Sequence, residues 1–393
     1  MIWNTFFRRP QLVLLRKALF QVHLWMGIAT GLYILTICTT GAALVFRSEM
    51  QHALYPQFYP ERDTAAPVAG IADVVRNMKA AYPDYPLSGV RAPNEEQQAF
   101  LGYMLKDERF RAVFADPATG KVIGSFPEES FLLWLQNLHF YLLSGTTGLF
   151  VNGLGALCLL FMCMTGLVIW WPGIESWRRS LTMKFGGNWK RITWEMHRTT
   201  GFWASALVLM WAATGIYFAF PQPFRTTVGL FAPMTVSPPV VSNAPIEPGT
   251  PTADLGSLVA RAQESLPEAH VARVSLPLTE RGSIQVVLSK SKPTPRDAAG
   301  DVYYYFDQFS GELLHSREVV ERSTGDVVIS SLALLHMGLF GGTGIKILWL
   351  ILGLSPAVLF VTGVAMWWNR VINQRWTTLQ NKEKEQLLDV YRG

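Results

Sequence analysis

Residues 22–41 read VHLWMGIATGLYILTICTTG, and residues 196–215 read MHRTTGFWASALVLMWAATG. Each stretch has a histidine second, a glycine four residues later and a Thr-Gly pair at its end. The offset between the stretches is the same for the histidines (197 − 23) as for the last glycines (215 − 41). Both stretches are long and apolar enough to cross a bilayer. They predict two equivalent membrane helices, each with a histidine near its start.

A second pair of stretches matches in the same way. LHFYLLSGTTGLF, which holds His139, matches LHMGLFGGTGIK, which holds His336. The offset between these two histidines recurs further along the chain, between Gly166 and Gly363 and between the pairs Trp170-Trp171 and Trp367-Trp368. The chain is therefore predicted to be internally duplicated, with four histidines in two matched pairs.

The composition is that of a membrane protein. Of 393 residues, 50% are hydrophobic and only 16% are charged, and the mean hydropathy is +0.20, which is too apolar for an ordinary soluble domain. The three cysteines are typical of small buried hydrophobic residues, because no pair is spaced like a disulfide or zinc site. Four segments reach the roughly 20 apolar residues that a span needs: about 19–46, 148–172, 199–221 and 344–368.

Lysine and arginine predict the orientation of these spans. They cluster in the N-terminal segment, in the short link 173–195 and in the C-terminal tail, and the positive-inside rule assigns all three to the cytoplasm. The two long links then face outward. Since the basic residues follow this topology and form no single soluble face, the net charge of +5 indicates no nucleic-acid partner; the expected partner is the lipid bilayer.

The two outward links share one pattern. An amphipathic helix is predicted at Ile71 to Pro83 and strands at Phe110 to Gly124, with a turn at Asp-Pro-Ala-Thr-Gly. In the second link a helix is predicted at Leu255 to Pro267 and a strand-turn-strand at Tyr303 to Ser316, with Asp-Gln-Phe-Ser-Gly at the bend. The Pro-rich stretch 233–251 is predicted to be a linker.

The helix-then-strands unit with its D-x-x-[ST]-G turn resembles a PepSY domain. Four helices bracketing two such units resemble the PepSY-associated transmembrane family over roughly residues 15–370. That family includes haem-containing, ferrioxamine-reductase-like enzymes of the bacterial inner membrane. The resemblance implies a membrane α+β fold, in which a four-transmembrane-helix bundle carries two periplasmic PepSY-like α+β domains and both termini are cytoplasmic.

The expected parts follow the chain in order. They are the N-terminal tail and first span (1–47), PepSY-like domain 1 (48–130), an outer-face helix and second span (131–172), a cytoplasmic loop (173–195), the third span (196–221), PepSY-like domain 2 (222–332), an outer-face segment and fourth span (333–369), and a cytoplasmic tail (370–393).

This topology sorts the four histidines into two pairs. His23 and His197 begin outward-going helices near the inner face, whereas His139 and His336 precede inward-going helices near the outer face. A b-type haem takes two axial imidazoles from facing elements. We therefore expect two haem b groups per chain, with iron bound by His23 and His197 and by His139 and His336. No C-x-x-C-H motif occurs, so the haem is expected to be non-covalent. The alternative is that the histidines are interfacial or packing residues that the duplication preserved.

The residues around the histidines have several interpretations. Gly27 and Gly201 lie one turn from the inner histidines and would admit a flat macrocycle or another backbone. The Thr-Gly pairs at 40–41, 165–166, 214–215 and 362–363 are interpreted as helix-packing contacts rather than haem hydrogen bonds. The paired tryptophans are interpreted as an interfacial belt. Basic residues near the inner histidines would pair with haem propionates or only fix the topology: Arg16, Lys17 and Arg198.

Other candidate residues carry weaker signals. Met26, Met196 and Met337 adjoin histidines, but neighbouring residues point about 100° apart on a helix, so they are expected to face other groups. The unrepeated His52, His270 and His315 are interpreted as surface residues, with substrate contact left open for His315. The run Tyr303 to Tyr305 is expected in a strand core or edge rather than in a substrate site.

The expected activity is oxidoreductase chemistry. No strand-linked G-x-G-x-x-G motif occurs, so the electron donor would be another cytoplasmic protein, a soluble flavin or a membrane quinol. The resemblance implies a ferric siderophore as the acceptor on the outer side, which makes the chain a ferric-siderophore reductase of iron uptake. Reduction suits iron release because Fe²⁺ is held far less tightly than Fe³⁺ by hard oxygen ligands. The sequence assigns no catalytic residue.

The sequence also bears on three other functional classes. A non-redox membrane protein, whose PepSY domains bind peptides or regulate a protease, stays open. A transporter is disfavoured because the membrane segments lack buried Asp or Glu and paired Pro/Gly-broken half-helices. A zinc protease is unexpected because no H-E-x-x-H motif or cysteine cluster occurs.

Overall fold

The computed structural model describes residues 7–10, 13–60, 67–94, 98–106, 109–235, 240–243, 250–290, 301–319, 323–373 and 375–376. The chain divides into two compact units. One is a helical unit (Met1–Phe46, Trp134–Thr226 and Ser331–Gly393), and the other is a sheet unit (Arg47–Leu133 and Thr227–Ser330).

The helical unit contains four helical segments that are long and apolar enough to cross a membrane, as the sequence predicts. The chain is therefore a multi-pass membrane protein. The segments are α2 (Leu14–Leu44), α6 (Gly145–Trp170), α8 (Trp189–Ala219) and Gly342–Asn373, which comprises α12 (Gly342–Gly353), α13 (Ser355–Trp367) and the π-helical turn η3 (Trp368–Asn373).

The fourth segment is interrupted once. Pro356 follows the first residue of α13 and has no N–H to continue the ladder of α12, so the helix restarts at Ser355.

A buried carboxylate also departs from the sequence expectation, which was wrong on this point. Helix α8 begins at Trp189, well before the predicted apolar stretch, and Glu195 within it is only 4% exposed. Glu195 pairs with Arg198 one turn later.

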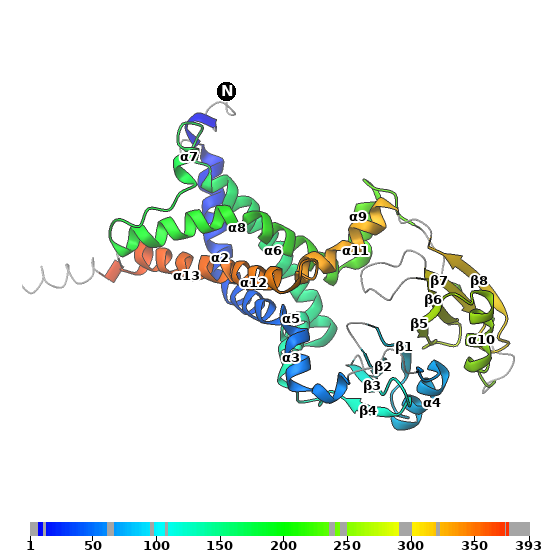
Figure 1. Ribbon diagram of the computed structural model, residues 1–393. Helices are drawn as coiled ribbons and strands as arrows, with labels where there is room; N and C mark the ends of the chain where they lie inside the picture. The colour runs from blue at the N-terminus through cyan, green and yellow to red at the C-terminus, as the bar shows by residue number, and fades with distance from the viewer. Residues whose placement is uncertain are drawn as a thin grey trace, which may run out of the picture. The chain divides into compact units, whose positions relative to one another are not determined.

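The four segments form a closed ring in which each one packs against two neighbours. Helix α2 packs against α6 and α13, and helix α8 packs against the same two partners (Figure 1). Helices α2 and α8 therefore lie diagonally across the bundle. These are the two helices that carry His23 and His197.

Shorter helices complete the chain. They are α3 (Arg47–Leu54), η2 (Pro56–Phe58), α5 (Phe131–Tyr141), α7 (Trp177–Ser180), α9 (Pro221–Gly229) and α11 (Thr324–Met337). Helix α5 ends two residues after His139, because Leu142 and Leu143 both take the left-handed conformation (φ 47° and 59°). Such backbone is costly for residues other than glycine. It reverses the chain into α6.

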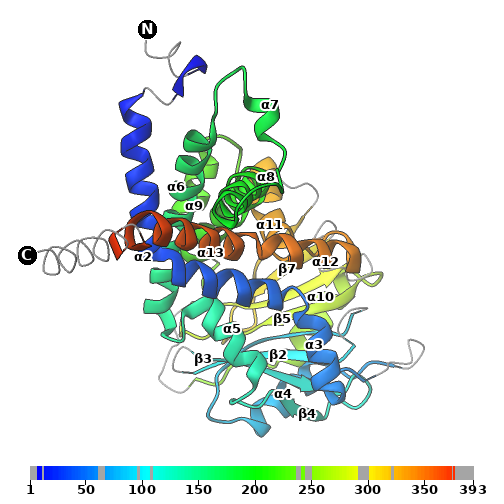
Figure 2. The ribbon, with the colours of Figure 1, turned by 90° about the vertical axis from the view of Figure 1, so that its left-hand side faces the viewer.

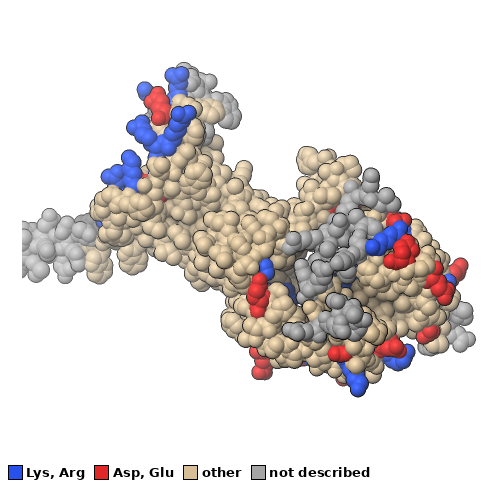
Figure 3. Space-filling model, in the orientation of Figure 1, with Lys and Arg blue, Asp and Glu red and all other residues tan. Residues whose placement is uncertain are grey.

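Charge is distributed unevenly over the helical unit. On the face in Figure 3, lysine and arginine gather around α7, and the surface of the helices beside it is almost free of charged residues. This is the pattern of a membrane span with a basic end. Of the basic residues that predict the orientation, Lys382, Lys384 and Arg392 lie outside the described residues.

In the described residues, the sheet unit forms one antiparallel sheet of eight strands in the order β4-β3-β2-β1-β5-β6-β7-β8. Strands β2 and β3 from the first link and β5 and β7 from the second are labelled in Figure 2. The first long link, between α2 and α6, supplies β1 (Leu87–Arg91), β2 (Phe100–Lys106), β3 (Arg109–Ala115) and β4 (Val122–Ser125). The second supplies β5 (His270–Ser275), β6 (Ile284–Ser289), β7 (Asp301–Phe306) and β8 (Leu313–Glu318).

The two links, expected as separate domains, join edge to edge through β1 and β5. The junction pairs Gly89 with Ser275 and Val90 with Val274. A side chain at Gly89 would meet the carbonyl oxygen of Val274 at 2.6 Å, so glycine is what permits this close pairing. This pairing gives hydrogen-bond partners to the backbone of β1 and β5, each of which would otherwise be an exposed edge strand.

Two helices pack on this sheet, α4 (Ile71–Ala81) and α10 (Leu255–Ser265), one from each link. They contact each other as well as the strands, and a single hydrophobic core runs beneath both. The core includes Met78 of α4 and Leu258 of α10. Tyr304 of β7 is 9% exposed and belongs to this core, as expected for a strand residue.

The two D-x-x-[ST]-G turns have the same geometry. Asp116 accepts hydrogen bonds from the backbone N–H of Ala118 and Thr119, and Asp307 accepts them from Phe309 and Ser310. The final glycine of each turn is left-handed, with φ +67° at Gly120 and +70° at Gly311. An L side chain is strained in that conformation, which explains the glycine in the motif.

Candidate histidine-pair sites

The structure brings His139 and His336 together. His139 lies near the end of α5 and His336 near the end of α11, and their ring centroids are 6.4 Å apart with 57° between the ring planes. Burial lowers the pKa of His139 to about 4 and that of His336 to about 3. Both imidazoles are therefore neutral at pH 7, which is the form that binds a metal ion.

His23 and His197 lie on the two diagonal helices. His23 lies on α2 and His197 on α8, and the two side chains are close enough to interact electrostatically. Among the described residues, no cluster of three or more His, Cys, Asp or Glu side chains is placed to hold a metal ion. The histidines thus offer imidazoles in pairs.

Every one of the four histidines is held by the threonine of a Thr-Gly pair. The contacts join Nδ1 of the histidine to Oγ1 of the threonine: His23 to Thr165 at 3.1 Å, His139 to Thr40 at 3.0 Å, His197 to Thr362 at 3.0 Å and His336 to Thr214 at 2.6 Å. All four threonines are buried, with exposures between 1% and 7%. The helix-packing interpretation of these pairs was incomplete, because the threonines bind histidine rings.

These hydrogen bonds have a defined direction. Each threonine hydroxyl already donates to the carbonyl four residues earlier in its own helix, as Thr40 does to Thr36 at 2.7 Å and Thr362 to Val358 at 2.7 Å. Thr165 and Thr214 do the same with Phe161 and Met210. The hydroxyl oxygen therefore accepts from the imidazole, so Nδ1 carries the proton. Nε2 is then left with its lone pair free to bind a metal.

The glycine of three Thr-Gly pairs admits the histidine ring. A Cβ at Gly41 would lie 2.7 Å from Cε1 of His139, and a Cβ at Gly166 or Gly363 would lie 3.3 or 3.4 Å from Cε1 of His23 or His197. Gly215 differs, because a Cβ there would meet Ala156 instead. In these three pairs, threonine positions the ring nitrogen and glycine provides the space for the ring.

Side chains of the spans also donate hydrogen bonds to the backbone carbonyls at and next to His139 and His336. Asn152 of α6 donates to the carbonyl of His139 at 2.8 Å, and Trp211 of α8 donates to the carbonyl of His336 at 3.2 Å. Trp349 donates to the carbonyl of Leu335 at 2.8 Å. The ends of α5 and α11 are therefore fixed to the bundle by their last carbonyls, which a helix leaves unpaired.

The outer pair has the spacing that a bis-imidazole haem needs. Two metal–nitrogen bonds of about 2.0 Å in line, plus about 1.1 Å from each nitrogen to its ring centre, place the centroids about 6 Å apart. The measured separation is 6.4 Å. The residues present thus fit an iron porphyrin held between His139 and His336.

The two pairs lie at different levels of the bundle. On α2, Thr40 contacts the outer pair, whereas His23 belongs to the inner pair. At the rise of an α-helix, the stretch from His23 to Thr40 is about 25 Å long. The same spacing separates His197 from Thr214 on α8, because the two stretches match residue for residue. The separation approaches the roughly 30 Å thickness of a bilayer core.

Other residues singled out in the sequence have different contacts. A Cβ at Gly27 would meet Met162 and one at Gly201 would meet Leu359, so these glycines face neighbouring helices. Arg198 is bound to Glu195 and to the carbonyls of Ser180 and Thr182, and so fixes the loop before α8.

The three unrepeated histidines are outside the histidine pairs. His52 packs edge-on against Tyr59, and His315 of β8 lies near Tyr305. His270 in β5 is half-buried, and its Nε2 has no hydrogen-bond partner among the described residues.

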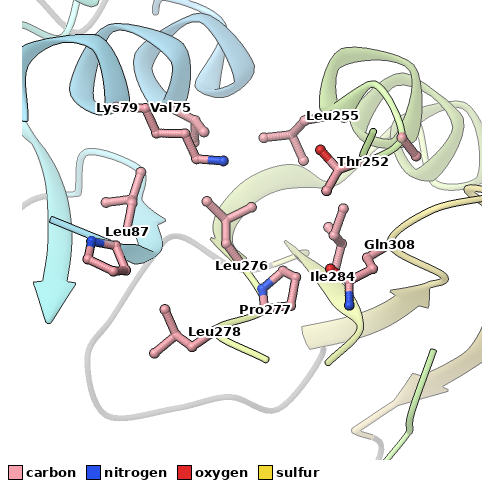
Figure 4. A pocket seen from close by; sticks show the side chains of 12 residues that line it. Val75, Lys79, Leu87, Thr252, Leu255, Leu276, Pro277, Leu278, Ile284 and Gln308 are labelled. Carbon is pink, nitrogen blue, oxygen red and sulfur yellow. The ribbon is translucent and has the colours of Figure 1, made fainter. Parts of the chain in front are cut away.

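The sheet unit contains a pocket of its own, of about 310 Å³. Helices α4 and α10 flank it, and Lys79 extends its amine from α4 between them (Figure 4). Most of the remaining lining is apolar, including Val75, Leu255 and Leu276. The volume is at the lower end of the range for small-molecule sites.

The sequence model of the PepSY-associated TM region matches residues 20–370 of the chain. This range covers all four histidines, nearly all of the four spans and the whole sheet unit. No curated protein matches the chain.

Proposed function

Because the chain belongs to the PepSY-associated transmembrane family, we propose that it is a two-haem b-type reductase of the bacterial inner membrane. It would carry electrons from a donor on the cytoplasmic side, or from the quinone pool, to ferric-siderophore complexes in the periplasm. His139 and His336 would bind the iron of one haem b, and His23 and His197 that of the other.

One observation supports this proposal more than any other. Four threonines hold the four imidazoles in one tautomer, with Nδ1 protonated and Nε2 free, and do so at both pairs. A histidine retained only for packing does not need this arrangement, whereas a metal ligand does, since the hydrogen bond at the second nitrogen fixes its orientation and basicity.

Haem iron with two imidazole ligands exchanges single electrons and leaves no open position for oxygen. The protein would fix the four histidine rings at two levels of the bundle and exclude water from around them. The buried threonines set the ring orientation, and the glycines set how closely each ring approaches its helix. These features keep the ligand geometry constant between oxidation states, which favours rapid electron transfer.

The proposed acceptor follows from the chemistry of iron release. A siderophore binds Fe³⁺ through hard oxygen ligands, and adding one electron gives Fe²⁺, which those ligands hold far less tightly. No proton, bond or leaving group has to be handled by the protein in this step.

The test uses purified protein loaded with haem and reduced anaerobically. We expect mixing with a ferric hydroxamate or ferric catecholate siderophore to return the Soret band to its oxidised position in stopped-flow measurements. The gallium complex of the same siderophore is the control, since Ga³⁺ has the same charge and similar size but accepts no electron. Failure of every ferric complex would refute the substrate class, and equal effects of gallium and iron would refute the reduction.

A second candidate function has one observation in its favour. The pocket between α4 and α10 is apolar with one amine, Lys79, and such a site suits the apolar side chain and acidic group of a peptide. A membrane protein that binds peptides through this unit would need no haem. A colourless preparation made with adequate iron supply, together with saturable peptide binding that Lys79→Ala weakens, would favour this reading over the first.

A further inference from the structure

Two tryptophans lie beside the inner histidine pair at matching positions. Trp170 is one helical turn after Gly166, which faces His23, and Trp367 is one turn after Gly363, which faces His197. Residues four apart share a helix face. Trp170 also stacks on Phe202 of α8, with centroids 4.0 Å apart and 22° between the rings. Each indole therefore lies near a histidine of the inner pair.

Both indoles carry a buried donor without a partner. Nε1 of Trp170 and Nε1 of Trp367 are shielded from solvent and have no hydrogen-bond acceptor among the described residues. Leaving such a donor buried and unpaired destabilises the folded protein. Burying the same unpaired group at both copies of a repeated position indicates that an acceptor binds there. Trp171 also has a buried unpaired N–H, but its ring packs edge-on against Phe7 of the N-terminal segment.

The positively charged guanidinium of Arg16 lies beside Trp170. Arg16 is two helical turns before His23 and so nearly on the same face of α2. Its Nη2 donates to the carbonyl of Ile169 at 2.5 Å, the residue before Trp170. Its Nε is also buried without a partner in the described part of the chain. The unpaired N–H groups of Trp170, Trp367 and Arg16 can donate hydrogen bonds to buried carboxylates, and the guanidinium of Arg16 can neutralise their charge.

We propose that the N–H groups of Trp170 and Trp367 each bind one propionate of the inner haem, with Arg16 supplying charge to the propionate at Trp170. This inference rests on the proposed function, because it concerns the haem between His23 and His197. A b-type haem has two propionates, one for each indole. Both indoles lie at the C-terminal ends of their helices, which adjoin the basic segments. The tryptophans thus bind the cofactor instead of forming an interfacial belt.

Phenylalanine substitutions test this role. Trp170→Phe and Trp367→Phe keep an aromatic ring for packing and remove the N–H. We expect both variants to keep two haems and a low-spin spectrum. Less neutralised propionates favour the ferric state, so we expect the equilibrium constant for reducing one haem to fall about three- to tenfold, which is ~30–60 mV for a one-electron couple. Trp368→Phe is the matched control, because Trp368 is 53% exposed, and it should change neither potential.

Resonance Raman spectra of the propionate bending bands give a second readout. In the wild-type protein these bands should have the frequency of hydrogen-bonded carboxylates, and Arg16→Gln should shift one of them. Unchanged potentials and bands in both tryptophan variants, or an equal shift in Trp368→Phe, would overturn the inference. Wild-type protein without haem would refute the proposed function instead, so the two failures are distinguishable.

Discussion

The imidazole of His336 lies 6.4 Å from that of His139, ring centre to ring centre, although the two residues belong to opposite halves of the chain. Each ring is fixed through Nδ1 by a threonine of a different span, Thr40 for His139 and Thr214 for His336. The pair is therefore assembled by four elements of the bundle. Two imidazoles with this centroid spacing are compatible with the proposed metal that has two axial ligands.

Thr214 is predicted to control the outer haem through His336. Among the described residues, Nδ1 of His336 has no acceptor besides Thr214 Oγ1, at 2.6 Å. Thr214→Val keeps the volume but removes the acceptor, which makes the imidazole a weaker donor to iron. We expect about 10- to 100-fold weaker binding of one haem. We also expect that haem to have a higher midpoint potential, measured by spectroelectrochemical titration.

Thr214→Ser is the control for this prediction, because it restores the hydroxyl. It should recover both the affinity and the potential of the wild-type protein. If the serine and valine variants behave alike, the hydroxyl has no role at His336 and the threonine acts only in helix packing.

Gly41 is predicted to tolerate no side chain. A Cβ there would lie 2.7 Å from Cε1 of His139, so Gly41→Ala must displace the His139 ring from the position that it takes in the pair. We expect loss of about half of the haem, measured by pyridine haemochrome against protein concentration. Gly344→Ala serves as the control in another span, since a Cβ at Gly344 meets nothing within 4 Å. Full haem content in Gly41→Ala would show that His139 is not held at this position when haem is bound.

The acid stability of the sheet unit is predicted to depend on Asp307. Burial raises the pKa of Asp307, but the N–H groups of Ser310, Phe309 and Asn243 outweigh this and hold the pKa below its ordinary value. Because the folded-state pKa is depressed, the stabilisation is complete above the unfolded pKa of about 3.9 and is lost as the pH falls through the folded value.

Unfolding temperatures across a pH series measure this effect. Asp307→Asn should lower the unfolding temperature at pH 7 and abolish much of the loss that the wild-type protein shows below about pH 4. The exposed Asp84→Asn substitution serves as the comparison and should leave the pH profile unchanged. A parallel profile for Asp307→Asn and the wild type would contradict the assignment.

The spans were predictable because a bilayer demands long apolar runs, and the described residues contain four such helical segments. The helix and strand order of the outward links followed from turn chemistry at Asp116 and Asp307. The fusion of both links into one sheet was not predictable. It depends on pairing β1 with β5, whose partners, such as Val90 and Val274, lie far apart in the sequence, and no local pattern encodes that pairing.

The histidines were found from their repeated spacing, but their partners were missed. Thr40 and Thr214 are separated by the same offset as His23 and His197 (214 − 40 and 197 − 23), so the signal was present in the sequence. It was assigned to helix packing because Thr-Gly pairs commonly serve that purpose. Which threonine meets which histidine depends on how the helices cross, and that information comes only from tertiary structure.

We propose that the four histidines bind two haems in two pairs, and haem stoichiometry is the decisive measurement for this proposal. Pyridine haemochrome assays on the wild type and on His23→Ala, His197→Ala, His139→Ala and His336→Ala are the measurement. We expect about two haems in the wild type and about one in each variant, with His23→Ala matching His197→Ala spectrally and His139→Ala matching His336→Ala. A wild-type protein without haem, or equal haem content in all five proteins, would contradict it.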